Sequence, residues 1–142
     1  MEHGLREIRI AAAVVLDADG RMLLVKKRGS PFFMQPGGKI EAGETPVVAL
    51  RRELAEEVSL DLSDVSAEGV FSAPAANEPG ASVVAHVFSA RTNRAPHISP
   101  EIDALHWLDL ADPAALPLAP LTRDHMVPLA RQLAAKPGGE LR

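Results

Sequence analysis

Three glutamates, Glu53, Glu56 and Glu57, are the residues whose type and spacing point most directly to chemistry. Positions three and four apart share one face of a helix, so these carboxylates would lie within roughly 100° of one another around the helix axis. Mg²⁺ takes oxygen ligands such as carboxylates and usually retains several waters. The spacing therefore indicates a candidate magnesium site on one helix.

A plainer interpretation is that the three carboxylates form a solvated acidic face. Like charges at this spacing cost only ~0.2–0.5 kcal/mol on an exposed helix, so repulsion alone does not exclude that interpretation. The carboxylates, however, border the apolar stripe of Leu50 and Leu54 and would stand at the edge of the core. Water screens their repulsion less there, which favours a bound cation.

The segment before this helix is rich in glycine and has the features of a phosphate-binding loop. Gly37, Gly38 and Gly43 let the backbone pass close to a ligand, and a helix N-terminus attracts anions. The basic run Lys26–Arg28 and Lys39 flank the loop, and all four side chains are candidates for contact with the phosphate that is not transferred. Arg28 and Lys39 are the two selected as substrate-binding residues. Long basic side chains beside a loop are also common on ordinary surfaces.

The stretch Gly38–Leu60 resembles the Nudix box, G-x5-E-x7-R-E-U-x-E-E-x-G-U, in which U is an apolar residue. The residues in register with that pattern are Gly38, Glu44, Arg52, Glu53, Leu54, Glu56, Glu57 and Leu60. The one departure is Ser59, where the family has glycine. Serine there costs ~1–2 kcal/mol if the left-handed conformation of the helix end is kept. The flanking segments are similar to the rest of the Nudix fold, so the resemblance spans nearly the whole chain.

The resemblance implies a hydrolase that uses Mg²⁺, with Mn²⁺ as the alternative ion, while water attacks a phosphorus of a nucleoside diphosphate linked to another group. On the matching positions, Glu53 and Glu57 would be the main metal ligands and Glu56 the next. Arg52 would orient Glu53, because a guanidinium holds a carboxylate by charged hydrogen bonds. Glu44 is either a water-mediated ligand or a structural partner of Arg52, and the pattern leaves both roles open.

Some family members carry a further acidic residue on a loop before a late strand, and Glu101 fits that placement ahead of Trp107. The alternative for Glu101 is an exposed loop position, which is the usual environment of glutamate. The general base therefore stays open among Glu53, Glu44 and Glu101.

Periodicity and turn residues predict the elements that position these side chains. Ile8–Leu16 and Met22–Lys27 predict an N-terminal hairpin, and the Gly- and Pro-rich Gly29–Gly43 predicts a long loop. The carboxylate helix is expected to follow an N-cap candidate in Glu44–Thr45, with Pro46 at its first helical position, and to continue over Val47–Val58. The remaining expected elements are strands at Gly69–Ala73, Ser82–Ala90 and Leu105–Leu110, and a helix at Thr122–Ala135 that Pro128 kinks or delays. Their mixed order predicts an α/β (α+β) fold, which the resemblance makes a Nudix-type α/β/α sandwich with a mixed β-sheet.

Length and charge limit the organisation and the partners. A chain of 142 residues is expected to form a single Nudix hydrolase domain, 1–142, with a loose tail at about 136–142. The net charge of −4 argues against binding long nucleic acid, because that affinity comes largely from Lys and Arg neutralising phosphates. No apolar segment approaches the ~20 residues that cross a bilayer.

The absence of cysteine limits the chemistry and the compartment. Disulfides, thiolate metal sites and thiol nucleophiles are excluded, which fits a reducing compartment. Ile8–Leu16 has the length of a signal-peptide core, but Glu2 and Glu7 precede it and no small-residue cleavage pattern is present. We therefore expect a cytoplasmic monomer or homodimer whose partner is a small nucleotide-like substrate and not a membrane.

Substrate choice lies outside the box, and several alternatives stay open. Nucleoside triphosphates, including oxidised ones, are the leading expectation, with ADP-ribose or a nucleotide sugar as the alternative. The motifs tied to coenzyme A or NADH are not found, and there is no tyrosine to supply the marker tied to dinucleoside polyphosphates. A non-catalytic nucleotide sensor is the alternative of another class, disfavoured because every acidic position of the box is retained.

Overall fold

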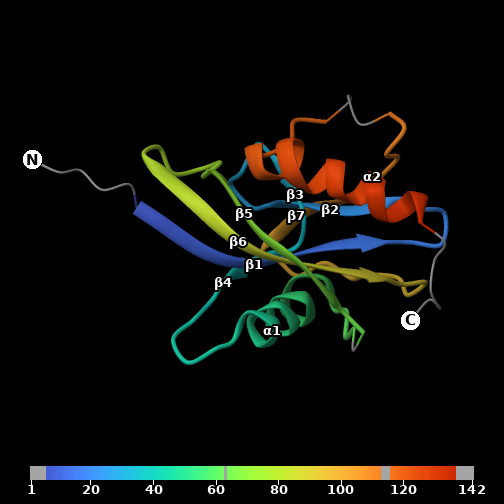
Figure 1. The fold of residues 1–142 in the computed structure, drawn as a ribbon, viewed down its shortest axis with the longest axis horizontal. Helices are drawn as coiled ribbons and strands as arrows, with labels where there is room; N and C mark the ends of the chain where they lie inside the picture. The colour runs from blue at the N-terminus through green and yellow to red at the C-terminus, as the bar shows by residue number, and fades with distance from the viewer. Residues whose placement is uncertain (1–5, 63, 113–115, 137–142) are drawn as a thin grey trace, which may run out of the picture.

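The computed structural model describes residues 6–62, 64–112 and 116–136, and Figure 1 shows them as a β-sheet with a helix on each face. Helix α1 (Pro46–Val58) covers one face and α2 (Val127–Ala135) covers the other. The strands are β1 (Arg6–Leu16), β2 (Met22–Lys27), β3 (Phe33–Met34), β4 (Gly37–Lys39), β5 (Ser66–Pro74), β6 (Ala81–Arg91) and β7 (Ile102–Leu108). This arrangement is the predicted α/β/α sandwich.

The sheet is mixed, as predicted. Its main path runs β3-β2-β1-β6-β5, while β4 also pairs with β1 and β7 also pairs with β2. β1 and β6 run parallel over the full length of β1, and the other pairings are antiparallel. β1 is therefore the central strand of the sheet, because β2, β4 and β6 all pair with it.

The predicted N-terminal hairpin is present only at its turn. The Asp17 carboxylate accepts hydrogen bonds from the backbone N–H groups of Asp19 and Arg21 at 3.0 and 2.8 Å, which closes the turn. β1 and β2 pair at Leu16 and Met22 and then separate. The rest of each strand takes a partner distant in sequence, β4 for β1 and β7 for β2, and no local pattern reports such partners.

The segment predicted as one long loop contains two short strands, β3 and β4, so that prediction was wrong in part. The sequence of β4 resembles that of a loop because two of its three residues are glycines, which have low strand propensity. Close approach requires glycine at Gly37, where the neighbour is backbone, and favours it at Gly38, where the neighbour is a side chain. A Cβ at Gly37 would collide with the carbonyl oxygen of Ala11, and a Cβ at Gly38 would collide with the carboxylate of Glu53.

The later strands lie close to their predicted positions but differ at their ends. β5 and β6 extend beyond the predicted ranges, because antiparallel pairing carries both strands to the turn between them. β7 begins and ends earlier than the predicted Leu105–Leu110. It pairs with β2 as far as Leu108, after which the Asp109 carboxylate accepts a hydrogen bond from the Ala111 N–H and starts a turn.

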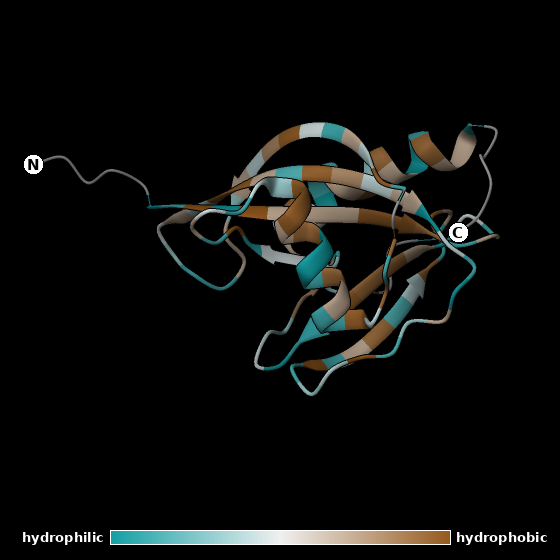
Figure 2. Ribbon diagram, turned by 90° about the horizontal axis from the view of Figure 1, so that it is seen from below, coloured by the Kyte–Doolittle hydropathy of each residue, from teal (hydrophilic) through white to brown (hydrophobic). Residues whose placement is uncertain are grey.

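Helix α1 begins at Pro46, as predicted, and its N-cap is Thr45, whose Oγ1 accepts a hydrogen bond from the Val48 N–H at 3.3 Å. Its apolar stripe packs against alternate residues of β1, and the intervening residues of β1 pack toward α2. Because both faces of β1 are buried from Ala11 to Leu16, that part of the strand is a continuous apolar run without alternation (Figure 2). Arg6, Glu7 and Arg9 at the start of the strand are exposed.

A π-helical turn, η2 (Thr122–Met126), precedes α2 and covers the start of the predicted helix Thr122–Ala135. The Val127 N–H donates to the Thr122 carbonyl, five residues back. Pro128 explains the wider turn, since its ring lacks an N–H and clashes with the carbonyl four residues before it. Helical residues already occur at Pro120 and Leu121, so Pro128 interrupts the helix at this turn. Of the two predicted effects, a kink or a late start, the late start was wrong. Most of the expected loose tail, 137–142, lies outside the described residues.

Ser59 ends α1 in the left-handed conformation that the box leads one to expect, at φ 57° and ψ 35°. Its Oγ donates to the carbonyl of His97 at 3.1 Å. The N–H groups of His97 and Ser99 donate to the last carbonyls of α1, those of Val58 and Glu57, at 2.9 and 3.0 Å. The segment that leads to Glu101 is thereby fixed to the end of α1.

We predict that Ser59→Ala lowers the free energy of unfolding by about 1 kcal/mol, because the hydrogen bond to His97 is lost and the strained conformation is kept. Ser59→Gly loses the same hydrogen bond without the strain, so it should be about 1 kcal/mol more stable than the alanine variant. Urea unfolding measures both values. Equal stabilities of the two variants would show that the left-handed conformation costs nothing.

Candidate active site

Arg52 is the centre of a charged network at the solvent edge of α1. Its Nε and Nη2 donate to the two carboxylate oxygens of Glu44 at 2.7 and 3.0 Å, a bidentate pair. Its Nη1 lies 3.1 Å from Glu53 Oε2 and 3.2 Å from Glu56 Oε1, and its Nη2 also donates to the Lys39 carbonyl. One guanidinium therefore fixes the loop, β4 and two helix carboxylates, including Glu53, which it was predicted to orient.

Glu44 is held as a carboxylate by this network. Hydrogen bonding from Arg52, helped by the Glu41 backbone N–H at 2.9 Å, lowers the pKa of Glu44 to about 2. The same pairing raises the pKa of Arg52. Both oxygens of Glu44 have protein partners, which is the geometry of the structural role that the sequence left open for it.

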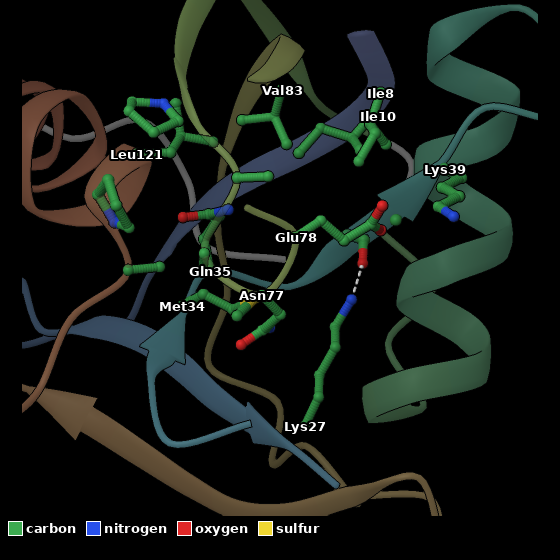
Figure 3. A pocket seen from close by; sticks show the side chains of 17 residues that line it. Ile8, Ile10, Lys27, Met34, Gln35, Lys39, Asn77, Glu78, Val83 and Leu121 are labelled. Atoms are coloured by element: carbon green, nitrogen blue, oxygen red, sulfur yellow. Dashed lines mark hydrogen bonds between the residues drawn. The ribbon is translucent and has the colours of Figure 1, made fainter. Parts of the chain in front are cut away.

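Glu57 is a buried carboxylate with two compensating partners. Its Oε1 accepts a hydrogen bond from the Gly37 N–H at 3.1 Å, and its Oε2 lies 3.0 Å from the Lys27 Nζ. The Lys27 Nζ also donates to the Gly37 carbonyl at 2.8 Å (Figure 3). Burial raises the pKa of Glu57, while the Lys27 charge and the Gly37 N–H act in the opposite direction. Sequence reasoning did not find the Lys27–Glu57 pair, since Lys27 was one member of a basic run.

Glu53, Glu57 and Glu101 line a single cavity of about 520 Å³, which we call the acidic cavity. Glu44 is not among its lining residues, and Glu56 is turned to solvent, with its side chain 60% exposed. The remaining lining residues are Lys27, Arg28, Gly38, Lys39, Glu41 and Ile102.

The predicted convergence of three carboxylates on one ion is not formed in this arrangement. Among the residues that the structure describes, no group of three acidic or histidine side chains lies close enough to hold a metal. The hydrogen bonds explain why: Arg52 draws Glu53 and Glu56 to one side, whereas Lys27 and Gly37 hold Glu57 on the other.

Arg28 holds the loop that carries Glu101. Its Nε and Nη2 donate to the Pro100 carbonyl at 3.1 and 2.5 Å, and its backbone N–H donates to the Glu101 carbonyl at 2.8 Å. Arg28 lines the acidic cavity as predicted for a substrate-binding residue, but its guanidinium already has a partner in the loop. The Glu101 residue is exposed, at the rim of the cavity.

A second cavity, of about 320 Å³, shares Lys27, Gly38 and Lys39 with the acidic cavity as a common wall. We call it the apolar cavity, because most of its side chains are aliphatic (Figure 3). Gly37, Gly38 and Lys39, three of the four residues predicted to bind substrate, line it. Gln35 also lines this cavity, and nothing in the Gly- and Pro-rich segment marked it beforehand.

Comparison with known proteins identifies the family. The family model of the NUDIX domain matches residues 6–130. The chain belongs to the Nudix family. A solved structure of a MutT Nudix hydrolase from Burkholderia pseudomallei is similar to this chain and is 28% identical in sequence. The two superpose with a TM-score of 0.72 over 89% of this chain and 97% of that one.

Two curated Nudix relatives have names that specify a reaction. An ADP-ribose pyrophosphatase of Methanocaldococcus jannaschii is 37% identical over 82 residues, which are 56% of this chain and 48% of that protein. An 8-oxo-dGTP diphosphatase of Haemophilus influenzae is 40% identical over 57 residues, 37% of this chain and 42% of that protein. The chain spans less than half the length of either relative. In the described residues, no helix is both long and apolar enough to cross a membrane.

We predict that Glu44→Gln weakens the acid dependence of stability. The pKa of Glu44 is about 2 in the folded protein against an ordinary 4.5, so the unfolded chain takes up this proton first as the pH falls. The stabilisation from Glu44 is complete above about pH 4.5 and is lost as the pH falls toward about 2.

Urea unfolding near neutral pH and at about pH 3 measures the effect. The loss of stability between the two should be smaller in Glu44→Gln than in the wild type. Glu7→Gln, at an exposed position of β1, is the control and should behave as the wild type does. Equal losses in all three proteins would contradict the assignment.

Proposed function

We propose that this Nudix protein hydrolyses a pyrophosphate linkage in a nucleoside diphosphate joined to another group, using Mg²⁺, or alternatively Mn²⁺, held by Glu53 and Glu57. The acidic cavity carries this proposal, because it gathers two of the four box carboxylates, Glu53 and Glu57, and Glu101 around one space. Names of relatives point to the same class of bond, since both a pyrophosphatase and a diphosphatase are among them.

The donor chemistry of the acidic cavity fits a hard divalent cation. The side chains there that can ligate a metal are all carboxylates, the donors that Mg²⁺ prefers. The Lys27 ammonium already contacts Glu57 at 3.0 Å, so this buried carboxylate accommodates a positive charge. Glu56, exposed beside Arg52, would take part as an outer partner. When bound, the ion supplies neutralisation of phosphate charge and activation of water.

The chain's own residues would position the phosphates. Lys27 and Lys39 stand in the wall common to both cavities, where their ammonium groups would meet phosphate oxygens. Gly38 has no side chain in that wall, and the close approach of Glu53 depends on its absence. Arg52 would keep Glu53 in one orientation through the 3.1 Å contact.

The contacts of the three candidate residues reduce the choice of general base. Both oxygens of Glu44 accept hydrogen bonds from Arg52 or Glu41, and Glu44 is not among the residues that line the acidic cavity. Glu53 and Glu101 do line it. We therefore propose that one of these two removes the proton from the attacking water, and that Glu44 acts through Arg52.

We propose a nucleoside triphosphate as the substrate, with ADP-ribose or a nucleotide sugar as the second candidate because of the ADP-ribose pyrophosphatase relative. The whole chain would act as one domain, as a monomer or a homodimer, on a nucleotide of the cytoplasm. Release of phosphate from a panel of these compounds, with Mg²⁺ and with a coupled pyrophosphatase where needed, tests the substrate class.

We predict that Glu53→Gln and Glu57→Gln each lower kcat/KM by about 100-fold or more, because each variant removes a negative ligand from the cation. Glu56→Gln should cost less, since this side chain points to solvent. Glu7→Gln is the matched control. Activity of the four variants is measured across a Mg²⁺ titration. Wild-type turnover by Glu57→Gln at limiting Mg²⁺ would remove Glu57 from the assigned role.

We predict that Glu101→Gln lowers kcat more than it changes KM, because a loop carboxylate at the cavity rim reaches its place when substrate is bound. Asp103→Asn is the control on the neighbouring strand, where Asp103 pairs with Lys26 at 3.5 Å. The measurement is the pH profile of kcat. A profile that is unchanged in Glu101→Gln would return Glu101 to the protein surface.

A further inference from the structure

The apolar cavity is lined by the side-chain amide of Gln35, whose NH₂ group carries two hydrogen-bond donors. Gln35 is 5% exposed, and its Oε1 accepts a hydrogen bond from the hydroxyl of Thr122 at 2.8 Å. Thr122 is fully buried, and with Gln35 Oε1 bonded to its hydroxyl the NH₂ end of the amide is the end turned to the cavity. Figure 3 shows the Gln35 amide nitrogen directed into the cavity, and no partner for that nitrogen occurs within the described ranges.

The other polar side chains of the apolar cavity have partners or lie near its mouth. Lys27 is engaged by Glu57 and the Gly37 carbonyl. Glu78 pairs with Arg6 at 2.9 Å, and the exposed Asn77 accepts a hydrogen bond from Ser30. The rest of the wall is apolar and includes Ile8, Ile10, Met34, Pro74, Val83 and Leu121. A flat apolar ligand would therefore meet its deepest polar contact at Gln35.

The position of the apolar cavity identifies the part of the substrate that it would hold. Its common wall with the acidic cavity contains Lys27, Gly38 and Lys39. A phosphate chain lying along that wall would have its reacting end beside Glu53 and Glu57 and its nucleoside end in the apolar cavity. A volume of about 320 Å³ is in the range of small-ligand sites, and a nucleobase has the flat apolar faces that these walls fit.

We propose that Gln35 determines base specificity by donating a hydrogen bond to a keto oxygen, so that 6-oxopurines and 4-oxopyrimidines are preferred to their 6-amino and 4-amino counterparts. The inference rests on the proposed function, because it names the base of the nucleotide that is hydrolysed in the acidic cavity. An amide NH₂ is only a donor. An amino group in the same place would meet it donor to donor, so the two groups could not pair.

Thr122 is the positioning residue in this arrangement. Without its hydroxyl, the Gln35 amide is free to present either its oxygen or its nitrogen. Thr122 is the first residue of η2, so the π-helical turn at the start of α2 sets the orientation of the group that reads the base. π-helical turns are frequent at functional sites, which agrees with this role.

The test compares IMP with AMP, whose bases differ in the oxygen or amino group at the 6-position and in the hydrogen that the IMP base carries on N1. Isothermal titration calorimetry without metal gives binding, and kcat/KM for ITP and ATP with Mg²⁺ gives turnover. The wild type should prefer IMP and ITP by about 10-fold or more, since sites built to hydrogen-bond a substrate group strongly reject an analogue that cannot pair.

Four variants separate reading of the base from general packing. Gln35→Glu presents an acceptor to the cavity and should reverse the preference toward AMP. Gln35→Met keeps the volume without a donor and should bring the ratio near one, as should Thr122→Val. Asn77→Asp makes the same amide-to-acid change at an exposed lining position and should keep the wild-type ratio. Thermal unfolding checks that each variant is folded.

Equal binding of IMP and AMP by the wild type, or an unchanged ratio in Gln35→Met, would overturn the role of Gln35. Failure of the proposed function gives a different result. In that case no nucleotide in the panel is hydrolysed with Mg²⁺, while the preference for IMP in the binding measurement still decides whether Gln35 reads the base.

Discussion

Burial of the Glu57 carboxylate is the constraint on which the rest of the site depends. An ionised carboxylate taken out of water costs several kcal/mol unless a charge and hydrogen bonds compensate it. Lys27 from β2 and the Gly37 N–H from β4 supply that compensation, so α1, β2 and β4 have to meet at one point. Gly37 is the residue that allows the meeting, because β4 crosses close to the backbone of Ala11 there.

Two cations divide the acidic residues between them, and this division accounts for the arrangement of the box. Arg52 forms hydrogen bonds with Glu44, Glu53 and Glu56, whereas Lys27 forms an ion pair with Glu57. A divalent ion bound between Glu53 and Glu57 would share each carboxylate with its present partner. Lys27 also stands in the wall of the apolar cavity, so the contact that stabilises the fold adjoins the place proposed for the phosphates.

The parts of the structure that depend on local periodicity could be predicted from the sequence. They include the position of α1, with Pro46 as its first residue, and the Arg52 contact with Glu53. The parts that depend on distant pairing could not. β4 is a strand only through its pairing with β1, Glu57 meets Gly37 across 20 positions, and Gln35 meets Thr122 across 87.

Hydrolysis of a nucleoside triphosphate in ¹⁸O-labelled water, followed by ³¹P NMR, tests most directly whether the acidic cavity brings water to phosphorus. A glycine-rich wall, the Lys27 and Lys39 ammonium groups and a cation on Glu53 and Glu57 would all direct positive potential at phosphate oxygens, where charge accumulates as the bond breaks. The account predicts that the label appears on a phosphate-containing product and that its incorporation requires Mg²⁺. Label found in the sugar hydroxyl, with none on phosphorus, would contradict it.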